Sequence, residues 1–273
     1  MNVDRARQVP NDARLPPEDL IHPAYDEPRP ALCEEVVVVL STQRSGSTML
    51  CEMLRAVGHS TPHEYFQPYL YLPLLAERGG CVGPDRTIDW PAYARFLVAR
   101  RTSSRGVLGI NAHAKHLPYL TRALPHLPGR RRLVTLKRAD LIGQALSLAE
   151  ARATGRWTDH FAPSGGWALD CDAALSCLRE IELQNAKIDA FVRLARWPTR
   201  TVTFEDLISD PENVIARASG LPQASLGALR ARRPTRLERQ SDTLKRGEEA
   251  RRFASYLLEA QPFGVDPDDL DRL

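Results

Sequence analysis

Apolar runs, polar turns and helical patterns alternate along this chain. The clearest run is 36–40, where four consecutive valines and a leucine predict a strand buried on both faces. Shorter runs predict strands at 107–110, 132–136 and 201–204, and the pattern over 90–101 predicts a helix. Strands that alternate with helices specify a parallel sheet with right-handed crossovers. We therefore predict an α/β fold, a P-loop-like three-layer sandwich with a central parallel β-sheet flanked by helices.

The polar turn after the first strand is the most informative segment. An i, i+1, i+4, i+5, i+8 apolar spacing follows it and predicts a helix that begins near Ser47, whose free N–H groups point back into the turn. Gly46 lets the backbone approach an anion, and Arg44 supplies a cation that stays charged at neutral pH. Ser45, Ser47 and Thr48 add hydroxyl groups. The turn therefore predicts a site for a phosphate or sulfate ester.

The turn differs from the nucleotide-triphosphate loop G-x-x-x-x-G-K-[ST]. In that loop the Lys contacts the terminal phosphates and the following hydroxyl binds magnesium. This chain has neither the first Gly nor the Lys at the corresponding positions. The sequence therefore favours a ligand whose group is transferred without magnesium. A P-loop kinase-like phosphotransferase and a non-catalytic nucleotide-binding protein stay open as alternatives.

Segment 41–48, Ser-Thr-Gln-Arg-Ser-Gly-Ser-Thr, resembles the 5′-phosphosulfate loop of sulfotransferases that use 3′-phosphoadenosine 5′-phosphosulfate (PAPS). The resemblance is closest to the bacterial trehalose-2-sulfotransferase-like family of carbohydrate sulfotransferases. Segments 62–66, 136–147, 204–211 and 237–242 follow in that family's order. The resemblance implies a metal-free transferase that moves a sulfuryl group from PAPS to a hydroxyl of a small-molecule acceptor, a carbohydrate or a secondary metabolite. The product of the donor would be 3′-phosphoadenosine 5′-phosphate (PAP).

The resemblance also implies roles for single residues. Glu64 is the expected general base, and Arg44 is expected to stabilise the leaving phosphate. Arg138 and Ser147 match the Arg and downstream Ser that bind the 3′-phosphate, with an Arg138–Asp140 ion pair as the alternative. A late cationic loop would cover the adenosine. The implied cofactor-binding residues are Gln43, Arg44, Ser45, Gly46, Ser47, Thr48, Arg138, Ser147, Arg239 and Gln240. Lys245 and Arg246 are further candidates, with a solvated run of charges as the alternative.

Glu64 is not the only candidate for the general base in this sequence. Glu64 lies in an aromatic segment that we expect to raise its pKa toward neutrality. His63, His113 and His116 are rival bases, because an unperturbed imidazole titrates near neutral pH. Asn111 to His116 departs from the family pattern, so a supporting role for Lys115 stays open.

Aromatic residues in loops are the candidates for the acceptor site. Their faces can stack on a sugar ring or an aryl group. The expected substrate-binding residues are Tyr65, Phe66, His113 and Trp157, with Tyr69 and Tyr71 in the same region. The sequence leaves open whether the acceptor is a sugar, a lipid-linked sugar or a polyketide-like alcohol or phenol.

Composition narrows the class of protein. With 43% hydrophobic residues, a chain of 273 residues can bury one substantial core, and a net charge of +3 is too small to indicate nucleic acid as a partner. No apolar run is long enough for a membrane span, and 1–14 lacks the apolar core of a signal peptide, so we expect a cytoplasmic protein. The five cysteines are scattered, which predicts reduced, mostly buried thiols and neither disulfides nor zinc.

The distribution of prolines and charged residues predicts a domain boundary near residue 33. Residues 1–33 carry many prolines among charges and show no helical or strand period, so we expect an extended or partly disordered leader. Residues 34–273 would then form a single sulfotransferase domain. A homodimer stays open as an alternative to a monomer.

Overall fold

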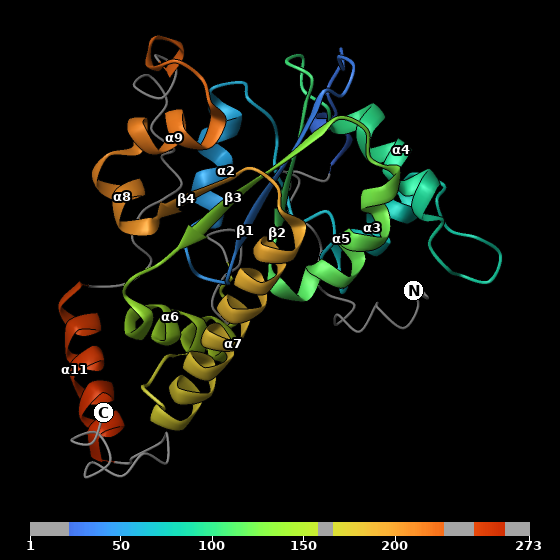
Figure 1. The fold of residues 1–273 in the computed structure, drawn as a ribbon. Helices are drawn as coiled ribbons and strands as arrows, with labels where there is room; N and C mark the ends of the chain where they lie inside the picture. Colours follow the sequence, from blue (N-terminus) through green and yellow to red (C-terminus); the bar gives the residue numbers. More distant parts are fainter. Residues whose placement is uncertain (1–21, 158–165, 227–242, 260–273) are drawn as a thin grey trace. The chain divides into compact units, whose positions relative to one another are not determined.

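The computed structural model describes residues 22–157, 166–226 and 243–259 (Figure 1). Chain contacts divide it into two compact units. The first, here the sheet unit, comprises Met1–Lys137 and Gln184–Pro234. The second, the helical unit, comprises Arg138–Leu183 and Thr235–Leu273. The boundaries expected from the sequence, a leader over 1–33 and one domain over 34–273, stay predictions.

A parallel sheet forms the centre of the sheet unit. Its strands are β1 (Glu35–Ser41), β2 (Val107–Ala112), β3 (Arg130–Lys137) and β4 (Thr199–Thr203). They lie in the order β2-β1-β3-β4, and every neighbouring pair is parallel. All four predicted strands exist, each one within a few residues of its expected bounds. The predicted central parallel sheet is confirmed.

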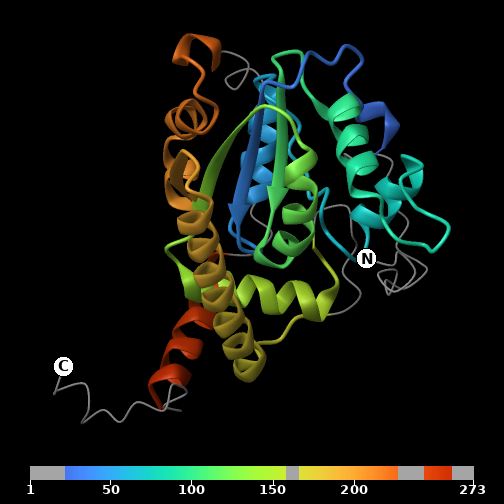
Figure 2. The same ribbon diagram turned by 45° about the vertical axis from the view of Figure 1, so that its right-hand side comes forward.

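Helices cover both faces of this sheet, as Figures 1 and 2 show. Alternate residues of β1 enter two different cores, and all five residues from Val36 to Leu40 are fully buried. One core receives α3 (Tyr71–Arg78), α4 (Trp90–Arg101) and α5 (Leu117–Ala123). The other receives helices from both ends of the unit: α2 (Ser47–Ala56), α8 (Phe204–Ser209) and α9 (Pro211–Ser219). The three-layer arrangement predicted from the sequence is therefore confirmed.

Local signals explain where these helices begin. The helix predicted at 90–101 has those bounds in the structure, because Asp89 accepts a hydrogen bond from Ala92 N–H at 2.9 Å and Pro91 occupies the first turn. The fourth strand ends one residue earlier than predicted. Thr203 caps α8 by accepting from Asp206 N–H at 3.1 Å, so Phe204 begins a helix instead of ending a strand.

Neighbouring segments contact each edge strand of the sheet. On β2, Ile110 forms a parallel bridge with His63, and Leu108 forms an antiparallel bridge with Thr102. On β4, the carbonyl of Thr201 accepts from the Arg217 guanidinium at 2.7 Å. Some backbone groups of each edge strand therefore have partners from within the unit, while Thr199–Thr201 of β4 stay exposed.

The described part of the leader packs on α4. It contains the short 3₁₀ turn η1 (Pro23–Tyr25). Asp26 forms an ion pair of 3.1 Å with Arg101, whose side chain has no exposed surface, and a second ion pair with Arg78. Arg101 also donates to the Tyr25 carbonyl at 3.0 Å. A buried guanidinium therefore holds this segment in place.

The helical unit has a core of its own. It contains α6 (Leu141–Thr154), α11 (Thr243–Glu259) and the first part of α7 (Cys171–Ala195), whose residues from Gln184 onward belong to the sheet unit. Leu146, Leu178 and Phe253 are among its buried residues. The remaining short 3₁₀ turns are η2 (Ala114–His116), η3 (Leu124–His126) and η4 (Gln223–Leu226).

Three observations bear on the classes of protein considered from composition. None of the described helices combines the length and apolar character that a membrane span needs. All five cysteines are free thiols, and four of them are buried, as predicted. Within the described residues, no cluster of His, Cys, Asp and Glu is arranged to hold a metal ion.

Candidate active site

The turn between β1 and α2, here the anion loop (residues 42–46), has an unusual backbone. Arg44 has φ of 60° and Gly46 has φ of 89°, so both adopt left-handed conformations. A non-glycine residue held in this region costs about 1–3 kcal/mol and occurs preferentially at functional sites. Such a turn directs its backbone N–H groups toward one point, which suits an anion.

Gly46 is required at its position for two reasons. Its φ disfavours any residue with a Cβ, and an added Cβ would collide with the ring of Phe204. Phe204 therefore closes one side of the anion loop. As the N-cap of α2, Gly46 has no side chain to bond the first N–H groups of the helix, so these point out of the helix end.

The hydroxyl groups of the loop are not equivalent. Ser45 is fully buried and donates to the Thr42 carbonyl at 2.8 Å, so its hydroxyl holds the shape of the loop. Ser47 is buried, and Thr48 is exposed at the start of α2. Gln43 and Arg44 are half-buried. The residues expected to bind the 5′ end of the cofactor are therefore neighbours around one turn.

Glu64 is placed by the edge of the sheet. The carbonyl of the preceding residue, His63, accepts from Asn111 N–H at 2.9 Å, which attaches this segment to β2. The segment thus ends at the carboxyl end of β2, where His113 follows the strand. Ligands in parallel α/β sheets bind at this end of the strands.

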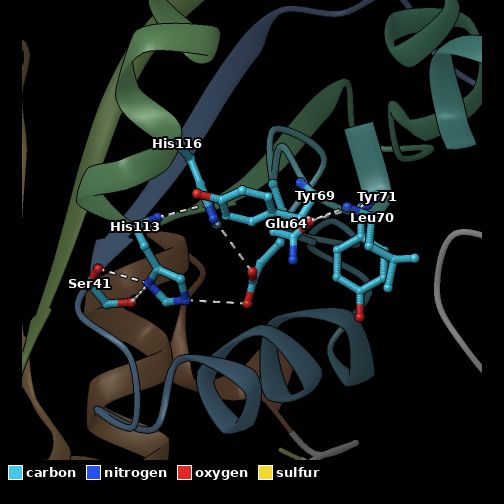
Figure 3. Close-up of polar contacts among 8 residues, drawn as sticks. Ser41, Glu64, Tyr69, Leu70, Tyr71, His113 and His116 are labelled. Atoms are coloured by element: carbon cyan, nitrogen blue, oxygen red, sulfur yellow. Dashed lines mark hydrogen bonds and ion pairs between the residues drawn. The ribbon is translucent and has the colours of Figure 1, made fainter. Parts of the chain in front are cut away.

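Glu64, His113 and Ser41 form a connected chain of polar contacts (Figure 3). His113 Nε2 lies 3.2 Å from Glu64 Oε1, and His113 Nδ1 lies 2.8 Å from the Ser41 carbonyl oxygen. The Ser41 hydroxyl lies farther from the same nitrogen, at 3.3 Å. Ser41 is the last residue of β1 and directly precedes the anion loop. The candidate base and the anion loop are therefore joined through one imidazole.

A second imidazole faces the other carboxylate oxygen. His116 Nε2 lies 3.7 Å from Glu64 Oε2, and the His116 side chain is fully buried. His116 Nδ1 accepts from the His113 backbone N–H at 3.1 Å. The Glu64 side chain keeps 26% of its surface exposed, so solvent or a ligand can reach it.

The electrostatics of Glu64 differ from the sequence expectation. We expected an aromatic setting to raise its pKa toward neutrality. Burial does raise the pKa, but the imidazoles of His113, His116 and His63 outweigh it and hold the pKa well below the usual range. That expectation is wrong, because the groups nearest the carboxylate are imidazoles from distant segments. Burial in turn lowers the pKa of His116 well below its usual value.

The aromatic residues expected at the acceptor site divide into two groups. Tyr65 and Phe66 have no exposed surface and belong to the core of the sheet unit. Tyr69 is 50% exposed, and Tyr71 packs edge-on against His63 with ring centroids 4.6 Å apart. Gln67 holds this stretch by accepting three backbone N–H groups through Oε1. In this structure, the aromatic surface near Glu64 comes from Tyr69 and Tyr71.

The residues expected to bind the 3′-phosphate lie in the helical unit. Arg138 pairs with Asp140 at 2.9 Å, and Ser147 is half-buried on α6. Arg246 pairs with Glu150 and, at 3.3 Å, with Glu249. Trp157 is 40% exposed. Arg239, Gln240 and the Lys245 side chain lie outside what the structure describes.

The sequence analysis does not predict two features of the site, the contact of Phe204 with Gly46 and the contacts of His113. Phe204 lies in a segment that the family resemblance includes, but no local pattern indicates that its ring covers Gly46. His113 contacts Ser41, which is 72 residues away in the sequence, and Glu64, which is 49 residues away. The only available signal was that all three follow or adjoin predicted parallel strands.

The fold and this site define a class of protein: a parallel α/β protein with a P-loop-like anion site after its first strand. A model of the Stf0 sulphotransferase family matches residues 36–254, and the chain belongs to this family. This confirms the resemblance drawn from the sequence and makes sulfuryl transfer its general activity.

Comparison with individual proteins adds little beyond the family. A solved structure, the sulfotransferase domain from the Synechococcus PCC 7002 olefin synthase, is similar to this chain at 17% identity with a TM-score of 0.46. The similarity covers 84% of this chain and 97% of that one. A search of curated proteins found no significant match.

Proposed function

We propose that this protein transfers a sulfuryl group from PAPS to a hydroxyl group of a carbohydrate or another small secondary metabolite, with Glu64 as the base. One observation carries the proposal. The carboxylate of Glu64 is linked through His113 to Ser41, the residue from which the anion loop starts. The proposed proton acceptor and the proposed anion site would thus share one end of one sheet, as transfer to an alcohol requires.

The residues of the anion loop fit the 5′-phosphosulfate. Gly46 has a left-handed backbone and packs against Phe204, which fixes the shape of the turn at the N-terminus of α2. The first N–H groups of α2 and the Arg44 guanidinium supply positive charge. When bound, PAPS supplies an activated sulfuryl group. Arg44 and the helix N-terminus would stabilise the charge that develops on the leaving phosphate.

Glu64 would align the acceptor and take its proton. The acceptor oxygen forms a bond to sulfur while the bond between sulfur and the bridging phosphate oxygen breaks, and that electron pair stays on PAP. The acceptor proton moves to Glu64 and from there to water. Because neighbouring imidazoles keep Glu64 ionised, it is always ready to accept a hydrogen bond, although the lowered pKa makes it a weaker base.

For the 3′-phosphate we keep Arg138 and Ser147 as the proposed ligands. Arg138 has a carboxylate partner in Asp140, so a phosphate would have to compete with this pair. Exposed ion pairs contribute only about 0–1 kcal/mol, whereas a charge-assisted bond to phosphate contributes about 1.5–3 kcal/mol. The exchange of partners would therefore favour the phosphate.

Binding and transfer test this function separately. Calorimetry with PAP, adenosine 5′-monophosphate and ATP, each with EDTA, should show tight binding of PAP alone, with the 3′-phosphate contributing about 2–4 kcal/mol. Transfer of ³⁵S from labelled PAPS is then measured on trehalose, glucose, 4-nitrophenol and 2-naphthol. Equal affinity for PAP and adenosine 5′-monophosphate would overturn the donor assignment. A magnesium-dependent transfer of phosphate from ATP would favour the kinase-like alternative.

A further inference from the structure

His113 makes contacts that fix where its protons lie. A carbonyl oxygen can only accept a hydrogen bond, so the contact of 2.8 Å between Nδ1 and the Ser41 carbonyl requires a proton on Nδ1. The Ser41 hydroxyl is more distant, at 3.3 Å, and does not change this assignment. The imidazole therefore presents Nε2 to Glu64 in a fixed orientation.

The second contact requires another proton. Nε2 lies 3.2 Å from Glu64 Oε1, and neither a bare imidazole nitrogen nor a carboxylate oxygen can donate. One proton must therefore lie between them. An imidazolium beside a carboxylate satisfies the contact, since both nitrogens of a charged imidazole are donors.

The surroundings favour the proton on His113. His116 and His63 also face Glu64 and favour its ionised form, whereas a protonated carboxyl would gain nothing from them. Cys51 on α2 is the other titratable group beside Glu64, and burial raises the pKa of its thiol well above the usual value, so it stays neutral. The positive charge of Lys115 contributes to lowering the pKa of His116.

We infer that His113 is a positioning residue for Glu64: tethered to the Ser41 carbonyl, its imidazolium holds Oε1 of the carboxylate and leaves Oε2 for the acceptor hydroxyl. This rests on the proposed function, which makes Glu64 the base. His116 Nε2 faces Oε2 at 3.7 Å, beyond hydrogen-bond distance, so this imidazole does not occupy Oε2. The His113 imidazole thus couples the orientation of the base to the start of the anion loop.

Two substitutions separate the contacts of His113. In His113→Gln the amide nitrogen takes the place of Nε2 and can still donate to Glu64. In His113→Asn it takes the place of Nδ1 and can still donate to Ser41. If His113 acts through Glu64, Gln retains more turnover than Asn, with kcat reduced at least about tenfold in Asn and the KM for PAPS unchanged in both. If His113 only ties down the chain at Ser41, the order is reversed.

A second readout does not depend on activity. Carbon-13 NMR of the Glu64 carboxyl, assigned by its loss in Glu64→Gln, follows its titration in the wild type and both variants. Both variants lack the imidazolium charge, so the pKa of Glu64 should rise by at least about one pH unit. His126→Gln, at an exposed position, is the control and should titrate like the wild type.

The outcomes distinguish the two proposals. Absence of ³⁵S transfer by the wild type to any acceptor overturns the proposed function, whereas the NMR titration still reports on His113. Wild-type turnover in both His113 variants, or an unchanged Glu64 titration in folded variants, overturns the role of His113 and leaves sulfuryl transfer intact. Circular dichroism melting of each variant confirms that it is folded.

Discussion

Glu64 is a single carboxylate surrounded by imidazoles. Glu64 comes from a segment that is attached to β2 by one bridge. Its partners His113 and His116 follow the end of that strand, and His113 in turn contacts Ser41 at the end of β1. Its environment is therefore assembled from three segments distant in sequence. This explains why its pKa is lowered although its neighbours in sequence are aromatic.

Substitution of this carboxylate should affect catalysis and not donor binding. Glu64→Gln keeps the shape of the side chain but cannot take a proton, so turnover should fall at least ~10²-fold while the Kd for PAP stays within a factor of about two. Steady-state ³⁵S transfer and calorimetry measure the two effects. Glu182→Gln, at an exposed position on α7, should behave as wild type. Near wild-type turnover in Glu64→Gln would move the role of base to another residue.

Gly46 permits a second test at the scale of the residue. Gly46→Ala adds a Cβ at φ of 89° and against the Phe204 ring, so it should weaken PAP binding and destabilise the fold by about 1–3 kcal/mol. Gly58→Ala is the matched control, since Gly58 has φ of 65° but no atom near the added Cβ. Urea unfolding and calorimetry of both variants separate backbone strain from the collision.

The collision itself can be isolated by a double substitution. If Phe204 is the obstacle, Phe204→Ala in the Gly46→Ala background should recover part of the lost stability beyond an additive expectation. Strict additivity of the two free-energy changes would show that the ring and the loop do not interact.

At the scale of elements, the described end of the leader is attached to α4 by a buried ion pair. Asp26→Asn leaves Arg101, which has no exposed side-chain surface, without its carboxylate and should lower the free energy of unfolding by about 3–5 kcal/mol. Urea unfolding measures the loss. Glu77→Gln removes the more exposed pair with Arg86 and should cost no more than about 1 kcal/mol. Equal losses in the two variants would contradict a special role for the buried pair.

The helices and strands are largely predictable from the sequence, because the residues that set their bounds lie within or next to them. The bounds of α4 follow from Asp89 and Pro91, and β1 from its run of valines. Phe204 was misplaced because it continues a run of β-branched residues, while the cap at Thr203 and the acidic first turn at Glu205 and Asp206 favour a helix. The contacts of Glu64 were not predictable, since they depend on which loops meet at the end of the sheet.

At the scale of the whole molecule, buried histidines make stability depend on pH. Burial, with Arg132 nearby, lowers the pKa of His59 from 6.5 to about 4, and burial lowers the pKa of His116 well below 6.5. Below pH 6.5 the unfolded chain binds protons that the folded chain excludes, so stability falls as the pH is lowered from 6.5 toward 4. For one such histidine, the slope of the free energy of unfolding against pH approaches about 1.4 kcal/mol per pH unit.

Urea unfolding at several pH values between 7.5 and 5 checks this dependence. His59→Gln removes one of the two groups and should reduce the loss of stability over this range, whereas exposed His126→Gln should keep the wild-type slope. An unchanged slope in a folded His59→Gln variant would assign the dependence to other groups.

The two edges of the sheet bear on how copies of this chain can associate. A free edge strand offers unpaired backbone groups to a second chain and so permits dimers or aggregates in which one sheet continues into the next. Here His63 and Thr102 cover β2, and Arg217 covers the carbonyl of Thr201 on β4. The β2 edge is therefore occupied near Leu108 and Ile110, whereas Thr199–Thr201 of β4 stay exposed, so a sheet that continues between two copies of this chain would form more readily at β4 than at β2.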